Sequence, residues 1–396
     1  MEQQGFACPQ GKQCGGCQYL YLGYQEQLAL KQKKIQKLLG GFGKVYPITG
    51  AADPLHYRNK VHAVFGHAKG GKIISGTYRE NSHQIVPVDS CLIENEQADA
   101  IIRDIRGLLQ SFRIKTYDED TGYGIFRHVL IRRGHRTGQI LVVLVTGTPV
   151  FPSRNNFVKA LLKLHPEIIS IVHNVNDRRT SMVLGERETV LYGSGWIEDE
   201  LCGLRFRISP KSFYQINSAQ TELLYEKAVS LAGLTGRERV IDAYCGIGTI
   251  GMVAAKKAGE VIGVELNRDA VRDARKNARQ NHISNIRFYE GDAGRWMSAM
   301  AADHGRADVV LMDPPRSGST REFMDAVFRL APKRVVYISC GPETLARDLA
   351  YFRKGGYRME GAWPYDLFCL TEHVETVCCL YHQKKEFISV PYEPKL

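Results

Sequence analysis

The sequence predicts an α/β protein in which a parallel sheet of βαβ units follows an α+β domain and a small N-terminal cysteine-rich segment. Three observations support this fold class. Before about residue 210, short β-type runs alternate with Gly- and Asn-containing turns. From Asn217 onward, short apolar strands alternate with amphipathic helices, the rhythm of a parallel sheet. Cys8, Cys14 and Cys17 crowd the N-terminus ahead of both regions.

The first half should divide into residues 1–50, with the cysteines and one helix, and an α+β domain at residues 51–210. A Lys- and Gln-rich pattern predicts the helix at about residues 22–39, with Gly40, Gly41 and Gly43 as its C-cap. β-type runs between turns predict strands at residues 61–65, 72–78, 125–132, 139–145 and 168–174. Further helices are expected at residues 94–112 and 156–164.

The second half, residues 211–396, should form the parallel sheet. Short apolar runs predict strands at residues 240–241, 260–264, 286–289, 309–312 and 334–338. The clearest amphipathic helices between them lie at residues 249–258 and 268–281. A C-terminal β-pair, at residues 357–363 and 373–381, should complete the sheet.

The amino-acid composition excludes several classes of protein. The 396 residues are 24% charged and 44% hydrophobic, which excludes a disordered or collagen-like chain. The formal net charge of +11 and the pI near 9.1 suit a polyanionic partner such as nucleic acid. The longest apolar stretch, around residues 140–145, is far shorter than the roughly 20 residues of a membrane helix, and residues 1–11 lack a signal-peptide core. We therefore expect a cytoplasmic protein, whose ten cysteines are reduced.

A Gly-rich turn predicts the cofactor site. It follows the strand at residues 240–241 and reads D-A-Y-C-G-I-G, from Asp242 to Gly248. Glu265 ends the next strand, where a carboxylate can accept both ribose hydroxyls of a nucleoside. The third glycine of a dinucleotide site is absent, while Asp292 and Asp313 add further loop acids. This pattern favours S-adenosylmethionine over a nicotinamide cofactor, and it resembles the class I (Rossmann-like) methyltransferase fold over residues 217–381.

Cys340 is the candidate nucleophile. It directly follows a predicted strand, and Pro342 favours the first turn of a helix just after it. We expect the helix dipole to lower the pKa of this thiol. Cys202, Cys378 and Cys379 are interpreted instead as ordinary buried cysteines.

Four ordered boxes resemble those of the RNA uracil-C5 methyltransferases. Residues 339–348 read S-C-G-P-E-T-L-A-R-D, close to the family's S-C-N-P-x-T-L-A-R-D. Residues 371–377, 214–217 and 313–316 are similar to its T-x-H-V-E-T, Q-x-N and D-P-P/A-R boxes. Gly341 stands in place of the usual Asn, and Cys369 and Leu370 in place of the frequent Pro-His.

The resemblance implies a site and a reaction. Cys340 would be the nucleophile, Glu375 the general base, and Gln215, Tyr244, Glu265 and Asp313 would line the S-adenosylmethionine site. Uracil C5 is a poor nucleophile, so a thiolate must first add at C6, and a carboxylate must later remove the C5 proton. If residues 370–377 form a strand, Glu375 and Glu372 point to opposite faces, and His373 shares the face of Glu375.

The N-terminal cysteines form a candidate metal site. Together with Cys91 they give four soft ligands, which suit an iron-sulfur cluster or structural zinc. The N-terminal pattern resembles the uracil methyltransferases that carry a 4Fe-4S cluster, which implies Cys8, Cys14, Cys17 and Cys91 as its ligands. Because methyl transfer moves no net electrons, a structural role is expected.

Basic and aromatic residues of the central domain are candidate RNA contacts. They are Tyr57, Arg58, Lys60, Tyr78, Arg79, Phe126, Arg127, His128, Arg132 and Arg133. The sequence has no room before Cys8 for the small β-barrel of many relatives, and this form most resembles the 23S ribosomal RNA enzymes. A transfer RNA target stays open. Two further alternatives are a cytosine-C5 methyltransferase, disfavoured by the absence of a Pro-Cys box, and a non-catalytic redox-sensing RNA-binding protein.

Overall fold

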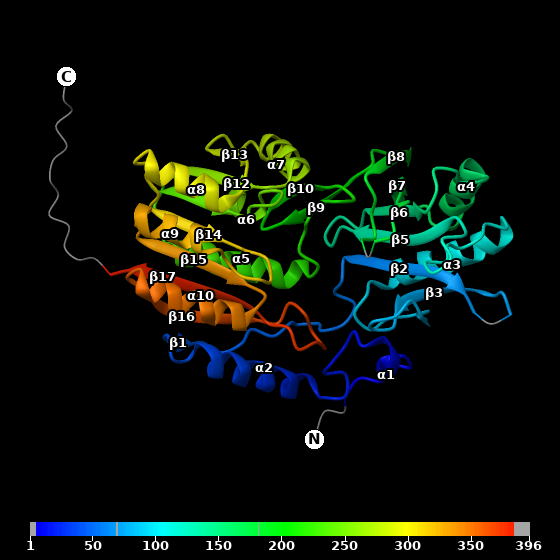
Figure 1. The fold of residues 1–396 in the computed structure, drawn as a ribbon, viewed down its shortest axis with the longest axis horizontal. Helices are drawn as coiled ribbons and strands as arrows, with labels where there is room; N and C mark the ends of the chain where they lie inside the picture. The colour runs from blue at the N-terminus through cyan, green and yellow to red at the C-terminus, as the bar shows by residue number, and fades with distance from the viewer. Residues whose placement is uncertain (1–4, 69, 181, 384–396) are drawn as a thin grey trace.

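Two β-sheets lie side by side in the computed structural model, which describes residues 5–68, 70–180 and 182–383. An N-terminal segment with helices α1 (Gly11–Cys14) and α2 (Tyr24–Leu39) runs along one side of both (Figure 1). Among the described residues, no helix is both long and apolar enough to cross a membrane.

The larger sheet has eight strands in the order β1-β16-β17-β15-β14-β11-β12-β13. Strands β11 to β15 are parallel, and β17 lies antiparallel between β15 and β16. The strands are β1 (Lys44–Val45), β11 (Arg239–Ala243), β12 (Glu260–Glu265), β13 (Ile286–Glu290), β14 (Val309–Met312), β15 (Arg334–Ser339), β16 (Tyr357–Tyr365) and β17 (Glu375–His382). The predicted parallel α/β fold is confirmed.

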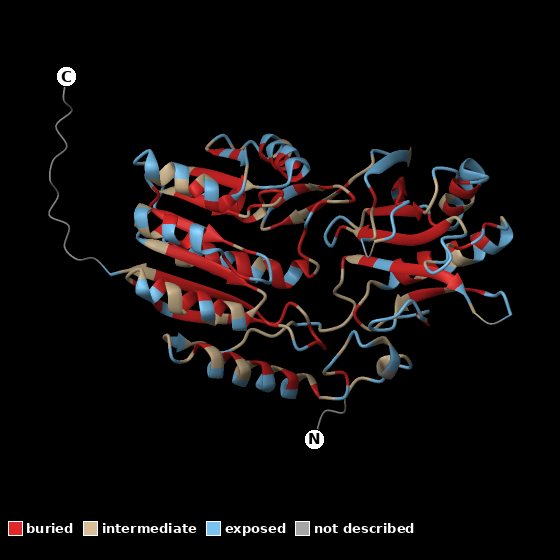
Figure 2. Ribbon diagram, in the orientation of Figure 1, coloured by how far each residue is buried: buried red, intermediate tan, exposed pale blue. Residues whose placement is uncertain are grey.

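Helices cover both faces of this sheet, so its strands are apolar on both sides. One core contains residues of α5 (Ser218–Ala232), α6 (Thr249–Ala255) and α7 (Arg268–Gln280). The opposite core contains residues of α2, α8 (Ala293–Ala302), α9 (Arg321–Leu330) and α10 (Pro342–Lys354). Figure 2 shows the result, with buried strands between helices that expose only their outer faces.

The second sheet has seven strands in the order β4-β3-β2-β5-β6-β7-β8. Helices α3 (Glu96–Ser111) and α4 (Arg154–Leu164) pack on one face, while residues of β5, β6 and β7 on the other face join a core of the larger sheet. The strands are β2 (Lys60–His67), β3 (Ile73–Tyr78), β4 (Ile85–Pro87), β5 (Phe126–Arg133), β6 (Ile140–Thr146), β7 (Ile168–Val175) and β8 (Arg187–Tyr192).

The structure departs from the predicted elements in several places. The sequence did not predict helix α1, strand β4, edge strand β8, which is mostly exposed, or the hairpin of β9 (Ile197–Leu201) and β10 (Leu204–Ile208). Strand β1, from the predicted first part, pairs with β16 of the larger sheet. Strand β17 begins at Glu375 rather than at residue 373, because its pairing with β15 and β16 starts only at Glu375 and Thr376.

Candidate active site

A cavity of about 520 Å³ opens at the carboxyl ends of the parallel strands, where α/β sheets bind ligands. It brings together all the residues predicted for catalysis and cofactor binding, namely Gln215, Tyr244, Glu265, Asp313, Cys340 and Glu375. Their place follows from the topology, because β11, β12, β14 and β15 all end at this edge. Antiparallel β17 contributes Glu375 at its first residue.

The Gly-rich turn forms one wall of the cavity. Tyr244 and Gly246 have left-handed backbones, with φ of +64° and +55°. A Cβ at Gly248, where φ is +81°, would lie 2.6 Å from Cζ of Phe288, so only glycine fits there. A left-handed tyrosine is uncommon, and such strain is typical of functional sites.

Glu265 holds this wall in place. Its Oε2 accepts a hydrogen bond from the backbone N–H of Gly246 at 3.0 Å, and its Oε1 accepts one from Asn267 at 2.7 Å. Each carboxylate oxygen keeps a further lone pair, which can accept from a ligand hydroxyl. The predicted loop acid Asp292 does not line the cavity; its side chain caps the N-terminus of α8.

The composition of the cavity fits S-adenosylmethionine. Carboxyl groups of Glu265, Asp313 and Glu375 suit a sulfonium cation, and Ile247 and Phe368 are among the apolar lining residues. Tyr244 and Gln215 add polar groups at the walls.

Cys340 lies half-buried between β15 and α10. Pro342 stands in the first turn of α10, as predicted. The predicted lowering of the Cys340 pKa is wrong, however, because burial and the nearby carboxyls of Glu375 and Asp313 raise it to about 11. Arg316, which lines the same cavity, acts in the opposite direction.

Thr344 holds the nucleophile loop. Its Oγ1 lies within hydrogen-bond distance of the carbonyls of Gly341, at 2.9 Å, and Arg316, at 3.0 Å. Thr344 therefore ties the Cys340 loop to the Asp313–Arg316 loop. Nothing in the structure explains why Gly341 replaces the usual Asn.

Glu375 is 2% exposed, and its Oε2 has no hydrogen-bond partner among the described residues. Burial and the charge of Asp313 raise its pKa well above the usual value, against the effect of Arg316. Burial also raises the pKa of Asp313, to about 7. A buried carboxyl with an unpartnered oxygen in a cavity is suited to proton transfer.

The predicted strand at residues 370–377, which would place Glu372 and Glu375 on opposite faces, is wrong, because residues 370–374 lie outside any strand. Glu372 is nevertheless exposed and Glu375 buried. His373 is half-buried and is not among the residues that line the cavity; its ring lies 6.0 Å from that of Phe368.

Known proteins are similar to this chain in sequence and in fold. The sequence model of the tRNA (Uracil-5-)-methyltransferase family matches residues 197–384. An uncharacterized RNA methyltransferase of Halalkalibacterium halodurans is 42% identical over 378 residues, covering 94% of this chain and 82% of that protein. The chain belongs to the RNA uracil-C5 methyltransferase family.

Two further matches agree with this family. An uncharacterized RNA methyltransferase of Caldanaerobacter subterraneus is 42% identical over 374 residues, covering 93% of this chain and 82% of its own length. A crystal structure of Pyrococcus abyssi tRNA (uracil-54, C5)-methyltransferase in complex with S-adenosyl-L-homocysteine superposes with a TM-score of 0.75 and 27% identity. The superposition covers 92% of this chain and 85% of the Pyrococcus abyssi chain. The protein is therefore an S-adenosylmethionine-dependent RNA methyltransferase.

The four predicted metal ligands of this methyltransferase lie in one region. Cys8, Cys17 and Cys91 pack against a small apolar cluster, and burial and the neighbouring Cys14 raise the pKa of Cys17 to about 11. No group of three or more His, Cys, Asp or Glu side chains in the described part of the chain has the arrangement of a metal site. The four cysteine thiols are thus of a type that binds a metal cluster, and they lie in one region. Their side chains are not arranged as the ligands of one metal site.

Four of the predicted RNA contacts are buried in the fold instead. Phe126 is fully buried against Phe65, Arg127 is buried and pairs with Glu119 at 2.7 Å, and Arg132 donates to the carbonyls of Pro210 and Ser212. His128 is 7% exposed, with its Nε2 3.8 Å from Oε1 of Glu119. Arg79 is exposed, while Arg58, Lys60 and Tyr78 are half-buried.

The sequence did not predict three aromatic side chains at the cavity of this methyltransferase, namely Phe213, Tyr225 and Phe368. Phe213 is 67% exposed although it lines the cavity, Tyr225 is buried on α5, and Phe368 lies on the loop before β17. The exposed Phe213 directly precedes the Q-x-N box, which is the one local signal that could have indicated it.

Proposed function

We propose that this methyltransferase acts on C5 of a uridine in RNA through a covalent bond between Cys340 and C6 of the base. One observation carries the proposal: Cys340 and Glu375 line the same cavity as Glu265 and Asp313. A nucleophile, a base and a cofactor wall therefore face one space that can hold a splayed base and a methyl donor.

Addition by Cys340 begins the proposed reaction. The thiol gives its proton to solvent, and its sulfur bonds to C6 while the C5–C6 electron pair moves toward O4, forming an enolate. S-adenosylmethionine would supply an electrophilic methyl group; as C5 bonds to it, the bond from the methyl group to the sulfonium sulfur breaks and S-adenosylhomocysteine leaves. The pKa of Cys340 is raised to about 11 even with the opposing charge of Arg316, which is the nearby group that favours the thiolate.

Glu375 completes the reaction. After methyl transfer, C5 carries both the methyl group and a proton, and a carboxylate must take this proton before the Cys340–C6 bond can break. The unpartnered Oε2 of Glu375 is available for that proton. The electrons of the C5–H bond restore the C5–C6 double bond, and the sulfur leaves as thiolate.

The two roles can be separated by substitution. Cys340→Ala should abolish both methylation and any complex with RNA that survives denaturation. Glu375→Gln keeps the shape but cannot accept the proton, so methylated RNA should stay bound to Cys340 on a denaturing gel. Formation of 5-methyluridine by Cys340→Ala, or a wild-type rate for Glu375→Gln, would contradict the assigned roles.

We propose ribosomal RNA, specifically 23S, as the first candidate substrate, because the cysteine pattern resembles that of the 23S enzymes. Transfer RNA is the second candidate, favoured by the structural similarity to the Pyrococcus abyssi tRNA enzyme. Mass mapping of 5-methyluridine in both RNAs from a strain lacking the protein distinguishes them.

We also propose that Cys8, Cys14, Cys17 and Cys91 hold a 4Fe-4S cluster with a structural role. Their packing in one region supports it. The cluster would tie the N-terminal segment to the chain around Cys91.

A further inference from the structure

Helix α2 carries a buried row of polar side chains that the proposed reaction does not use. Tyr24, Gln27 and Lys31 are spaced at i, i+3 and i+7, so they share one face of the helix. Gln27 and Lys31 are 0% exposed. We call these three residues the polar stripe. A helix face buried against a protein core is normally apolar, so the stripe requires an explanation.

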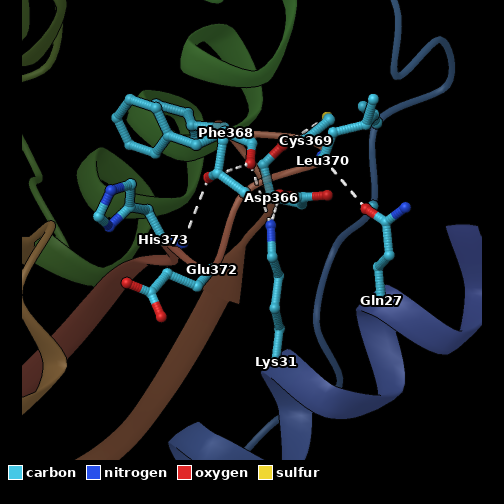
Figure 3. Close-up of polar contacts among 12 residues, drawn as sticks. Gln27, Lys31, Asp366, Phe368, Cys369, Leu370, Glu372 and His373 are labelled. Carbon is cyan, nitrogen blue, oxygen red and sulfur yellow. Dashed lines mark hydrogen bonds and ion pairs between the residues drawn. The ribbon is translucent and has the colours of Figure 1, made fainter. Parts of the chain in front are cut away.

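The polar stripe contacts the loop of residues 366–374, between β16 and β17, which we call the base loop (Figure 3). The Nζ of Lys31 lies 2.6 Å from Oδ1 of Asp366 and donates to the carbonyl of Phe368 at 3.1 Å. The hydroxyl of Tyr24 donates to Oδ2 of Asp366 at 2.9 Å. Both carboxylate oxygens of Asp366 are thus held by one helix.

The N-terminal segment also satisfies the backbone of left-handed Leu370. Its N–H donates to Oε1 of Gln27 at 3.1 Å, and its carbonyl accepts from the N–H of Tyr19 at 3.0 Å. Tyr57 donates to the carbonyl of Cys369 at 3.1 Å. Backbone strain of this kind persists only where its surroundings hold it.

The base loop connects these contacts to the active site. Phe368 lines the cavity, and in Figure 3 its ring points away from α2, on the far side of the loop from Lys31. The loop ends at Glu375, the proposed base. Cys369 and Leu370, the two residues that depart from the family box, are fully buried in the apolar cluster with Leu20 and Ile93.

Stability does not account for the stripe, because apolar residues of similar volume are often as stable as a buried ion pair. We infer that Lys31, with Tyr24 and Gln27, is a positioning residue that fixes the base loop, and so the placement of Phe368 and Glu375. This inference rests on the proposed role of Glu375 in uridine methylation.

The test compares Lys31→Met, Lys31→Arg and the control Lys33→Met in the full chain. Lys33 is exposed, two residues along the same helix, so its replacement removes an equal charge on another face. Lys31→Met should lower kcat by about tenfold or more, as expected from a small displacement of a catalytic group. Its Kd for S-adenosylmethionine should stay unchanged, Lys31→Arg should recover part of kcat, and Lys33→Met should match wild type.

Two further measurements separate positioning from a structural role. Amide hydrogen exchange in peptides covering residues 366–374 should be faster in Lys31→Met than in Lys33→Met. The double variant Lys31→Met/Asp366→Leu should regain the wild-type Tm but not kcat, because the base loop still lacks the hydrogen bond from Lys31 to the Phe368 carbonyl that ties it to α2. Recovery of kcat together with Tm, or unchanged exchange in Lys31→Met, would overturn the inference.

A failure of the proposed function would give a different result from a failure of the inference about Lys31. Wild-type protein that forms no 5-methyluridine in any RNA would overturn uridine methylation. The exchange measurement would still decide whether Lys31 fixes the loop, because it does not depend on turnover.

Discussion

The ammonium group of Lys31 lies 2.6 Å from a carboxylate oxygen of Asp366, although 335 residues separate the two along the chain. Both side chains are 0% exposed. The pair joins the helix that follows the cysteine segment to the loop that precedes the proposed base.

Removing one member of this pair should strongly destabilise the fold. Asp366→Ala leaves the charge of Lys31 buried without its partner, so the free energy of unfolding should fall by about 3–5 kcal/mol. Chemical denaturation measures it. Glu343→Ala is the matched control, since the pair of Glu343 with Lys34 is 61% and 32% exposed and should contribute less than about 1 kcal/mol. Equal losses for both variants would refute the burial argument.

The rate should rise with pH. Cys340 and the Asp313–Glu375 carboxyls must lose protons to act, and burial raises their pKa values, to about 7 for Asp313 and about 11 for Cys340. Values of kcat/KM should therefore increase through neutrality and continue to increase on the alkaline side. Rates of methyl transfer at saturating S-adenosylmethionine test this, and a profile that falls above neutrality would contradict it.

Arg316→Gln should move that profile to higher pH. The charge of Arg316 lowers the pKa values of both Cys340 and Glu375, so its loss should raise both. The same pH series measures the displacement. Arg321→Gln, on α9 and outside the cavity lining, is the control that should leave the profile in place. An unchanged or acid-shifted profile for Arg316→Gln would show that its charge does not act on these groups.

Glu265→Ala should weaken binding of S-adenosylmethionine by about 1.5–3 kcal/mol, the range for charge-assisted hydrogen bonds. The substitution also removes the carboxylate that accepts hydrogen bonds from the backbone N–H groups of Gly246 and Asn267. Calorimetry measures the Kd directly. Glu290→Ala at the end of neighbouring β13 is exposed and should bind like wild type. A wild-type Kd for Glu265→Ala would place the ribose elsewhere.

Protein purified without oxygen should be brown and contain iron, because four thiols suit a 4Fe-4S cluster. Cys91→Ser should lose the iron and destabilise the N-terminal half, since a metal site contributes to folding. Iron and zinc analysis decides between the metals. Cys202→Ser, distant in sequence from the N-terminal set, should keep its iron; colourless wild-type protein with stoichiometric zinc would refute the cluster.

The parallel sheet and the cavity walls were predictable because their signals are local. Buried parallel strands such as β12 read as short apolar runs, and each candidate site residue directly follows such a run or lies in a recognisable box. Once the topology gathers the carboxyl ends of the strands at one edge, residues such as Glu265, Asp313 and Cys340 must meet.

Properties set by distant partners were not predictable. The raised pKa of Cys340 comes from burial and from carboxyls on β17 and after β14, whereas the local sequence had suggested a helix dipole that lowers it. Lys31 and Gln27 were predicted only as part of a Lys- and Gln-rich helix, because the loop that buries them lies more than 300 residues away. Arg132 likewise read as an RNA contact, although it binds the carbonyl of Pro210 within the fold.

Strand β17 occupies an interior place in its sheet, yet it is the last strand that the structure describes. At ribosomal speeds, the 335 residues from Gln32 to Asp366 take roughly 20 to 70 s to synthesise. During that time α2 lacks its partner, and once β15 and β16 have been made, the place between them stays empty until β17 follows. Translation of the base loop and β17 is therefore the step that closes the sheet, and the growing polypeptide stays catalytically silent until then.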